Sequence, residues 1–283
     1  MLARMPTPTG FDASLVRAAL DAARALPAAT SVFAITGLQG SGKSTLAAQL
    51  VAAAEAEGLR AATLSIDDFY LTRAERERLA REVHPLLATR GPAGTHDLPL
   101  ALATLDALRD GRPAALPRFD KLADERLSET RWPRTAGRVD LVVFEGWFLK
   151  TPAEPDPSLA APLNALERDE DADGTWRRWC NAALARDYPA LWQRIDALWF
   201  LRGPGFDVVP EWRWQQEQAL QTAAPGRTGM RRAEIERFVQ FYERVSRQAL
   251  RSLPAIAERT LPLDHMRRPG RSSARRGTSV PEC

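Results

Sequence analysis

Cysteine is scarce in this chain of 283 residues, which contains only Cys180 and Cys283. The two lie far apart and form no Cys-x-x-Cys pair, so the sequence supports neither a disulfide framework nor a zinc site. Sparse, unpaired cysteine is typical of a protein that works in a reducing compartment. We therefore expect a cytoplasmic protein.

Long apolar runs are also missing. The first 30 residues alternate polar and apolar side chains, and no uninterrupted apolar stretch reaches the length of a signal peptide or of a membrane-spanning helix. This pattern excludes the usual signals for export and for membrane insertion. We expect no membrane partner.

Lysine is rare as well, since Lys43, Lys121 and Lys150 are the only ones. The formal net charge is +3, but the arginines that supply the positive charge are dispersed among acidic residues. Nucleic-acid-binding surfaces instead gather Lys and Arg on one face or along one helix. We therefore expect no nucleic-acid partner.

Apolar periodicity divides the chain into three parts. Residues 11–27 carry apolar positions at helical spacing and end at a proline, so residues 1–30 are predicted to form an N-terminal helical extension. Residues 31–266 alternate apolar strand-like runs with helical patterns, as in one α/β domain. Residues 267–283 lack apolar periodicity and are rich in Arg, Ser, Gly and Pro, so we expect a disordered basic tail.

Five short apolar runs in the central part predict strands. They are 31–37, 60–69, 139–146, 196–203 and, more weakly because Pro262 interrupts it, 259–265. Apolar runs that alternate with helices are typical of a mostly parallel central sheet flanked by helices. A helix predicted over residues 44–58 follows the first strand after a glycine loop.

The glycine loop reads GLQGSGKS over residues 37–44 and fits the pattern G-x-x-x-x-G-K-[ST] of a P-loop. Glycines let successive backbone N–H groups turn toward phosphate oxygens, and the following helix directs its N-terminal dipole at the same anion. In such loops the lysine, here Lys43, reaches the β and γ phosphates, and the hydroxyl, here of Ser44, coordinates Mg²⁺. We expect the following residues to bind ATP: Gly37, Gln39, Gly40, Ser41, Gly42, Lys43, Ser44 and Thr45.

Acidic side chains follow two of the predicted strands. Glu145 comes after the run LVVF, where a carboxylate would act on Mg²⁺ or its waters. Asp67 and Asp68 end the strand 60–69, and adjacent strand residues point in opposite directions. Only one of the two acids is then expected to accept the proton of an attacking hydroxyl, and we choose Asp67, which is also a candidate metal ligand. The alternative is that both acids cap the next helix.

Two further patterns are incomplete. The acidic stretch 169–174 begins like a calcium loop, but Cys180 stands where a bidentate glutamate is needed, so we expect a solvated acidic turn. The Asp-Lys pair at 120–121 matches only part of a guanine-reading element, because Phe119 precedes it. ATP rather than GTP is therefore the expected nucleotide.

Several segments of the sequence, taken in order, resemble the D-glycerate 3-kinase family. They are GLQGSGKST, SIDDFYLT (65–72), RGPAGTHD (90–97), PRFDK (117–121), FEGW (144–147) and EWRWQQEQAL (211–220). The family is grouped with P-loop kinases such as uridine kinase, pantothenate kinase and phosphoribulokinase. The resemblance covers roughly residues 31–266 and implies a P-loop NTPase fold with lid and acceptor-site insertions.

This resemblance implies ATP-dependent phosphorylation of D-glycerate to 3-phosphoglycerate, with Asp67 at the position of the hydroxyl-activating acid. It also implies that Arg213 belongs to a mobile lid, so that catalysis would depend on Asp67, Lys43 and Arg213. A small hydroxy acid would be the acceptor, because an Arg fork suits its carboxylate while Asp and His suit its hydroxyls. The acceptor pocket would be lined by Asp68, Tyr70, Arg90, His96, Asp97, Asp120, Lys121 and Trp147.

One segment departs from the plant-type pattern of this family, in which Gly-Asp-Arg follows the Asp-Lys pair. Here residues 122–129 read LADERLSE. Either Asp124 and Arg126 replace that element, or the pocket fits another small acid or a polyol. The alternatives are a P-loop kinase for a nucleoside, pantothenate or a sugar-like acceptor, and a non-catalytic ATP-binding regulator. The sequence leaves the oligomeric state open.

Overall fold

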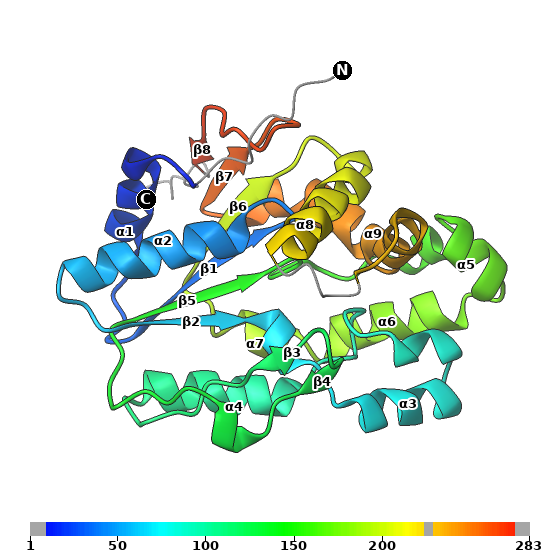
Figure 1. Ribbon diagram of the computed structural model, residues 1–283, viewed down its shortest axis with the longest axis horizontal. Coiled ribbons are helices and arrows are strands. Elements are labelled where there is room, and N and C mark those ends of the chain that lie inside the picture. The colour runs from blue at the N-terminus through cyan, green and yellow to red at the C-terminus, as the bar shows by residue number, and fades with distance from the viewer. Residues whose placement is uncertain (1–9, 224–228, 275–283) are drawn as a thin grey trace, which may run out of the picture.

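The computed structural model describes residues 10–223 and 229–274, which build a sheet with helices on both faces (Figure 1). Its strands are β1 (Ser31–Gly37), β2 (Ala61–Ser65), β5 (Leu141–Gly146), β6 (Ala197–Arg202), β7 (Arg259–Pro262) and β8 (Ser273–Ala274). They stand in the order β2-β5-β1-β6-β7-β8. The first five are mutually parallel and β8 joins antiparallel at the edge, so the predicted mostly parallel sheet is confirmed.

Helices connect the parallel strands, as the crossovers of a parallel sheet require. The described helices are α1 (Ala13–Arg24), α2 (Lys43–Ala56), α3 (Arg73–Glu82), α4 (Leu98–Arg109), α5 (Ala165–Glu170), α6 (Thr175–Arg186), α7 (Pro189–Trp192), α8 (Val209–Ala223) and α9 (Arg232–Ile256). A short antiparallel hairpin of β3 (Phe119–Asp120) and β4 (Glu125–Arg126) stands apart from the main sheet.

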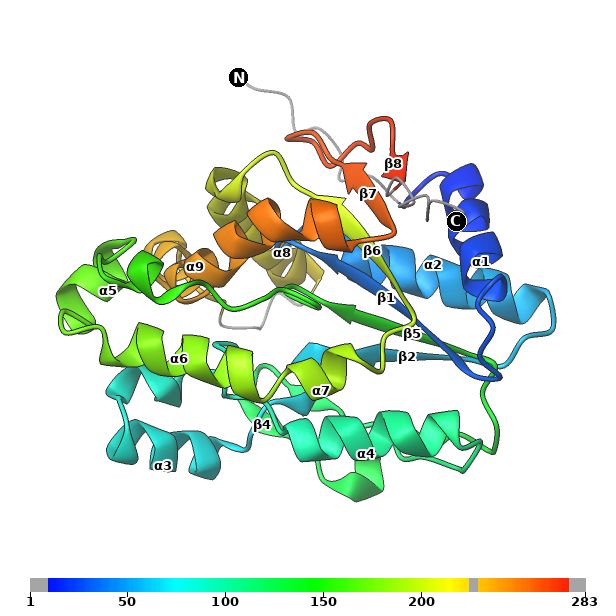
Figure 2. The ribbon, with the colours of Figure 1, turned by 180° about the vertical axis from the view of Figure 1, so that it is seen from behind.

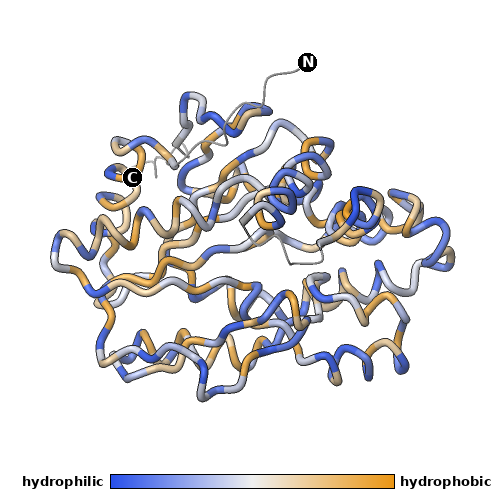
Figure 3. The backbone as a smooth tube through the Cα atoms, in the orientation of Figure 1, coloured by the Kyte–Doolittle hydropathy of each residue, from blue (hydrophilic) through white to orange (hydrophobic). Residues whose placement is uncertain are grey.

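The sheet separates two halves of the hydrophobic core because its central strands β1, β5 and β6 are buried on both faces. Along β1, Val32 and Ala34 join the half that includes residues of α4, α7 and α9. Figure 2 shows these three helices from behind. Phe33 and Ile35 join the other half, which includes residues of α1 and α2. The hydropathy colouring places apolar stretches along the central strands, as this double burial requires (Figure 3).

The second strand is shorter than the sequence pattern suggested. It ends at Ser65, and the 3₁₀ helix η1 (Ile66–Phe69) follows directly. The Ser65 hydroxyl accepts a hydrogen bond from the backbone N–H of Asp67 at 3.3 Å, which favours a tight turn over continued pairing. The prediction that Asp67 and Asp68 end a strand is therefore wrong, because both lie on this turn.

Both ends of the described chain lie against the helix that follows the P-loop or against the loop itself. At the N-terminal end, α1 packs on α2, and the backbone of Phe11 exchanges two hydrogen bonds with the Gln49 amide at 2.8 and 2.9 Å. At the other end, Arg267 donates from Nε to the carbonyl of Gly40 at 2.7 Å. Residues 267–274 are thus placed where we expected disorder, while 275–283 lie outside the described residues, as do 1–9 of the predicted extension.

No helix within residues 10–223 and 229–274 is both long enough and apolar enough to cross a membrane.

Candidate active site

The carboxyl ends of three neighbouring parallel strands bring the predicted functional residues to one edge of the sheet. The P-loop follows β1, η1 follows β2, and Glu145 lies near the end of β5. The strand register places Glu145 beside Ile35 of β1 and Ser65 of β2. Ligands of open α/β sheets bind outside this edge, so the topology alone gathers the candidate site.

The P-loop has the backbone that its glycines predict. Gly40 and Gly42 adopt φ of +80° and +92°, which residues with a Cβ rarely do. A Cβ on Gly40 would also come within 2.7 Å of the Cβ of Trp212. Gly42 is the N-cap of α2, so the unpaired N–H groups of the first turn face the loop. Gly37 ends β1, and a Cβ there would meet the Leu201 carbonyl at 2.6 Å.

Lys43 and Ser44, the first two residues of α2, point to different partners. The Lys43 ammonium is buried and donates to the Leu38 carbonyl at 3.1 Å. Burial lowers the pKa of this ammonium, while the carboxylates of Glu145 and Asp67 oppose the shift. The Ser44 hydroxyl donates to Oε1 of Glu145 at 3.1 Å. A hydroxyl and a carboxylate beside a P-loop are the donors that a hard cation such as Mg²⁺ prefers.

Asp67 has a hydrogen bond on each carboxylate oxygen. Tyr70 donates from its hydroxyl to Oδ1 at 2.7 Å, and Lys121 donates from Nζ to Oδ2 at 2.6 Å. Burial alone would raise the pKa of this carboxyl, but the charge and hydrogen bond of Lys121, together with Tyr70, bring it well below its ordinary value. Asp67 is therefore a carboxylate at neutral pH.

A cavity of about 160 Å³ lies between the P-loop, η1 and α8. It is lined by Gln39, Gly40, Lys43, Ser44, Asp67, Tyr70, Arg90, Lys121, Glu145, Trp147, Arg213, Gln216, Phe238 and Tyr242. Eleven of these fourteen were candidates from the sequence. Gln216, Phe238 and Tyr242 were missed. Gln216 lies in the segment 211–220 that carries the resemblance, but only Arg213 was chosen from it, and Phe238 and Tyr242 lie on α9, where no motif marked them.

Two of the expected acceptor residues lie behind this cavity wall. Asp68 accepts from the backbone N–H of Phe119 at 3.1 Å and from Arg118 at 3.4 Å, and burial raises its pKa to about 6 against these two partners. His96 lies beneath Tyr70, with their ring centroids 4.9 Å apart, and burial lowers its pKa to about 4. Neither residue lines the cavity.

The other two outlying candidates, Asp97 and Asp120, are engaged with local backbone. Asp97 is the N-cap of α4 and accepts from the Leu100 N–H at 3.0 Å. Asp120 accepts the N–H groups of residues 122 and 123 at 2.9 and 3.0 Å, which closes the turn after β3. Short acidic side chains commonly accept hydrogen bonds from their own backbone in this way. Asp97 and Asp120 therefore do not line the cavity, although both belong to segments that carry the family resemblance.

The segment that departs from the family pattern supports the cavity from outside. The Asp124 carboxylate pairs with Arg76 at 3.0 Å and with Arg90, which lines the cavity. Arg126 pairs with Asp97 at 2.6 Å. Asp124 and Arg126 thus hold neighbouring residues in place, and Arg90 in turn donates to the Lys121 carbonyl at 3.2 Å.

Arg213 reaches the cavity from α8. Its guanidinium donates to Gln216 at 3.1 Å and lies 3.8 Å from the Glu217 carboxylate on the same helix. Trp212, the preceding residue, is buried against the P-loop at Gly40. The helix that carries Arg213 is therefore in direct contact with the loop.

A second cavity, of about 390 Å³, lies on the outer side of the P-loop. From the P-loop and the start of α2 it is lined by Gly40, Ser41, Gly42 and Thr45, and from α8 by residues that include Gln216. Gly40 and Gln216 also line the first cavity. The opposite wall comes from both ends of the described chain: Gly10, Phe11, Arg267, Arg268 and Pro269. The two cavities thus share a wall.

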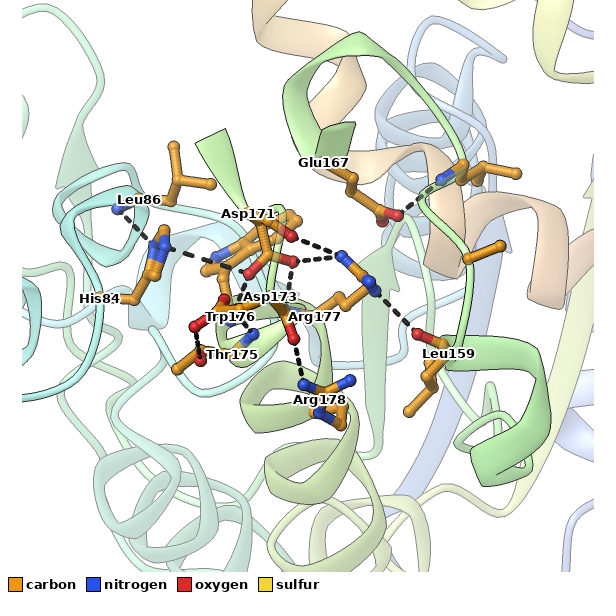
Figure 4. Close-up of polar contacts among 12 residues, drawn as sticks. His84, Leu86, Leu159, Glu167, Asp171, Asp173, Thr175, Trp176, Arg177 and Arg178 are labelled. Atoms are coloured by element: carbon orange, nitrogen blue, oxygen red, sulfur yellow. Dashed lines mark hydrogen bonds and ion pairs between the residues drawn. The ribbon is translucent and has the colours of Figure 1, made fainter. Parts of the chain in front are cut away.

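The acidic stretch 169–174 is exposed at residues 169, 170, 172 and 173, but Asp171 within it is buried. Asp171 is 1% exposed and pairs with Arg177 at 3.0 Å, and it accepts the backbone N–H of Trp176 at 2.7 Å (Figure 4). The expectation of a solvated turn is therefore wrong for Asp171, whose carboxylate accepts backbone N–H groups of the first turn of α6. No cluster of three His, Cys, Asp or Glu suited to a metal occurs in the part of the chain that the structure describes.

Comparison with known proteins places the chain in a family. No protein-family model matches it. It is 35% identical to an uncharacterized kinase, mug58, of Schizosaccharomyces pombe over 221 residues, which are 75% of this chain and 78% of that protein. It is 33% identical to the chloroplastic D-glycerate 3-kinase of Arabidopsis thaliana over 222 residues, 75% of this chain but only 46% of the plant protein.

Solved structures agree with the sequence comparison. The D-glycerate 3-kinase of Cryptococcus neoformans matches with a TM-score of 0.71 and 27% identity, covering 92% of this chain and 97% of that one. The YGR205w protein matches with a TM-score of 0.64 and 25% identity, covering 87% and 90%. With a P-loop at the edge of a parallel sheet and relatives that share most of its length, the chain belongs to the D-glycerate 3-kinase-like family of P-loop kinases.

Proposed function

We propose that this kinase transfers the γ-phosphoryl group of ATP to a hydroxyl of a small hydroxy acid, and that the acceptor is D-glycerate, which becomes 3-phosphoglycerate. The observation that carries the proposal is the position of Asp67, a carboxylate in the same cavity as the P-loop lysine and Ser44. A hydrolytic switch or a regulator needs no carboxylate base for an alcohol. The names of the plant and fungal relatives support the choice of acceptor.

The charges around the cavity favour an anionic acceptor. Four cationic side chains line it, namely Lys43, Arg90, Lys121 and Arg213, against the two carboxylates of Asp67 and Glu145. Lys43 and Arg213 would face the phosphates of ATP, which leaves Lys121 and Arg90 on the acceptor side. Tyr70 and Trp147 complete that side, while Asp68, His96, Asp97 and Asp120 would act by supporting it from behind.

In the proposed reaction the acceptor hydroxyl oxygen forms a bond to the γ-phosphorus, and the bond from that phosphorus to the β,γ-bridging oxygen breaks. The hydroxyl proton passes to Asp67, and ADP leaves with the electron pair of the broken bond. Lys43 and Arg213 stabilise the charge on the transferring group, and α8 excludes water that would otherwise be phosphorylated in place of the acceptor.

Magnesium and the nucleoside each have residues that fit them. Mg²⁺, when bound with ATP, would neutralise phosphate charge, and Ser44 and Glu145 would hold it directly or through water. Asp67 would be a poorer metal ligand than Glu145, because the Lys121 ammonium already lies 2.6 Å from its Oδ2 and would repel a second cation. The outer cavity beside Thr45 would receive the base and ribose.

The test is acceptor-dependent ADP release by the purified protein with MgATP. The acceptors would be D-glycerate, L-glycerate, glycerol, pantothenate, uridine and ribulose 5-phosphate, with the product identified by mass and NMR. Turnover with D-glycerate and phosphate on the 3-hydroxyl is expected. Turnover with a different acceptor alone would support kinase activity but contradict D-glycerate as the acceptor. No acceptor-dependent ADP release with any of the six compounds would instead favour an ATP-binding regulator.

A further inference from the structure

The ion pair between Lys121 and Asp67 has an unusual consequence for a catalytic carboxylate. With Lys121 Nζ at 2.6 Å from Oδ2 and the Tyr70 hydroxyl at 2.7 Å from Oδ1, each oxygen already accepts a hydrogen bond. The carboxylate that should take a proton from the acceptor hydroxyl is neutralised by a cation. Each oxygen keeps a second lone pair, but the Lys121 charge lowers the affinity of the carboxylate for a proton, so Asp67 is a stronger base once this donor moves away.

The two donors differ in how easily they can move. Tyr70 is 2% exposed, and its ring packs on Phe119 and His96 with centroid separations of 5.1 and 4.9 Å. Lys121 has a side chain that is 58% exposed and extends from a turn. A flexible four-carbon stem carries its charge, so the ammonium can change position more easily than the packed Tyr70 ring. Lys121 is the donor that can leave.

The backbone beneath Lys121 is fixed, so only its head group needs to move. Arg90 donates to the Lys121 carbonyl at 3.2 Å and is itself paired with Asp124. Asp120 closes the turn by accepting two backbone N–H groups at 2.9 and 3.0 Å. The ammonium can then swing over the cavity while its Cα stays in place.

We propose that Lys121 is a latch on Asp67 and that the carboxylate of the acceptor opens it. This inference rests on the proposed function. When a hydroxy acid enters, its carboxylate takes the Lys121 ammonium, one ion pair replaces another, and Oδ2 of Asp67 is released to accept the hydroxyl proton. A neutral polyol offers no charge to the ammonium, so the latch stays closed. Without an acceptor, the same pair keeps Asp67 from activating water and wasting ATP.

The experiment compares D-glycerate with glycerol, which carries a hydroxymethyl group in place of the carboxylate. It also measures ATP hydrolysis without any acceptor. The variants are Lys121→Met, which removes the charge, Lys121→Arg, which keeps it, and Lys150→Met, which removes a lysine that does not line the cavity. Thermal melting checks the fold of each, and the exposed position of Lys121 predicts unchanged melting.

In Lys121→Met we expect hydrolysis without acceptor to rise at least about tenfold, because a freed general base contributes 10²–10⁴-fold at best. The preference for D-glycerate over glycerol in kcat/KM should fall by a similar factor. Lys150→Met should retain low hydrolysis and the preference of the unchanged protein, and Lys121→Arg, which keeps the charge, should show less acceptor-free hydrolysis than Lys121→Met.

If Lys121→Met loses the preference while hydrolysis stays low, Lys121 only binds the carboxylate, and the latch is overturned. Unchanged preference and unchanged hydrolysis overturn it as well. Failure of the unchanged protein to phosphorylate D-glycerate would be a failure of the proposed function. The acceptor-free hydrolysis of Lys121→Met still reports on the latch in that case, so the two failures are distinguishable.

Discussion

The hydroxyl of Tyr188 lies 2.6 Å from Nδ1 of His96 and also accepts the backbone N–H of Gly94 at 2.9 Å. Burial favours the neutral form of this imidazole. His96 thereby supports Tyr70 from below as an uncharged ring.

His96 should make stability depend on pH. Burial lowers its pKa from 6.5 to about 4, so between these values the unfolded state binds more protons than the folded state. The contribution of His96 to the free energy of unfolding should therefore rise with pH from about 4 to 6.5 and level off above 6.5, while Asp68, with its pKa raised from 3.8 to about 6, acts in the opposite direction between those two values. Urea titrations across pH 4–8 on the unchanged protein and on His96→Asn would give this contribution as the difference between their free energies of unfolding. Parallel curves for the two proteins would contradict the assignment.

Asp67 and Asp68 offer a matched pair of substitutions on one turn. Asp67→Asn should lower kcat by about 10²–10⁴-fold, because the amide cannot accept the hydroxyl proton. Asp68→Asn should retain most of the turnover, since Asp68 faces Arg118 and the Phe119 backbone rather than the cavity. Steady-state kinetics and ATP affinity by fluorescence titration would separate catalysis from binding. Equal losses in both variants would refute the choice of base.

Glu145 should set the demand for magnesium. Its carboxylate accepts from Ser44 at 3.1 Å, so Glu145→Gln is expected to raise the Mg²⁺ concentration needed for half-maximal activity and to lower kcat. Removal of the metal with a chelator should abolish turnover in every variant. Glu129→Gln, at an exposed ion pair with Arg134, is the control and should leave the Mg²⁺ requirement unchanged. An identical requirement in Glu145→Gln would argue against its role.

Asp171 should be far more important for stability than its acidic neighbours. Its buried pair with Arg177, with side chains 0% and 2% exposed, predicts that Asp171→Ala lowers the free energy of unfolding by about 3–5 kcal/mol. Asp169→Ala removes a partner from an exposed pair and should have almost no effect. Chemical denaturation would measure both. Similar values for the two variants would mean that the Asp171 pair contributes no more than a surface pair.

The local chemistry of the sequence was sufficient for the framework of the site. Apolar runs predicted the parallel strands, because a strand buried on both faces must be apolar throughout. The glycines and Lys43 predicted the P-loop, because their spacing between a strand and a helix suits a bound phosphate. Glu145 and the acids at 67–68 followed from the rule that the carboxyl ends of parallel strands meet at one edge. All of these signals are local in sequence.

Only the tertiary structure decided which residues line the cavity. Asp120 and Lys121 are adjacent, yet the first closes a turn and the second reaches Asp67. Tyr242 and Phe238 enter the cavity from α9, and Phe11 reaches the P-loop from the other end of the chain. Such placements depend on packing between segments far apart in sequence. The residue type of a side chain and its neighbours in sequence determine which groups it can bind, but packing between distant segments determines which groups lie within its reach.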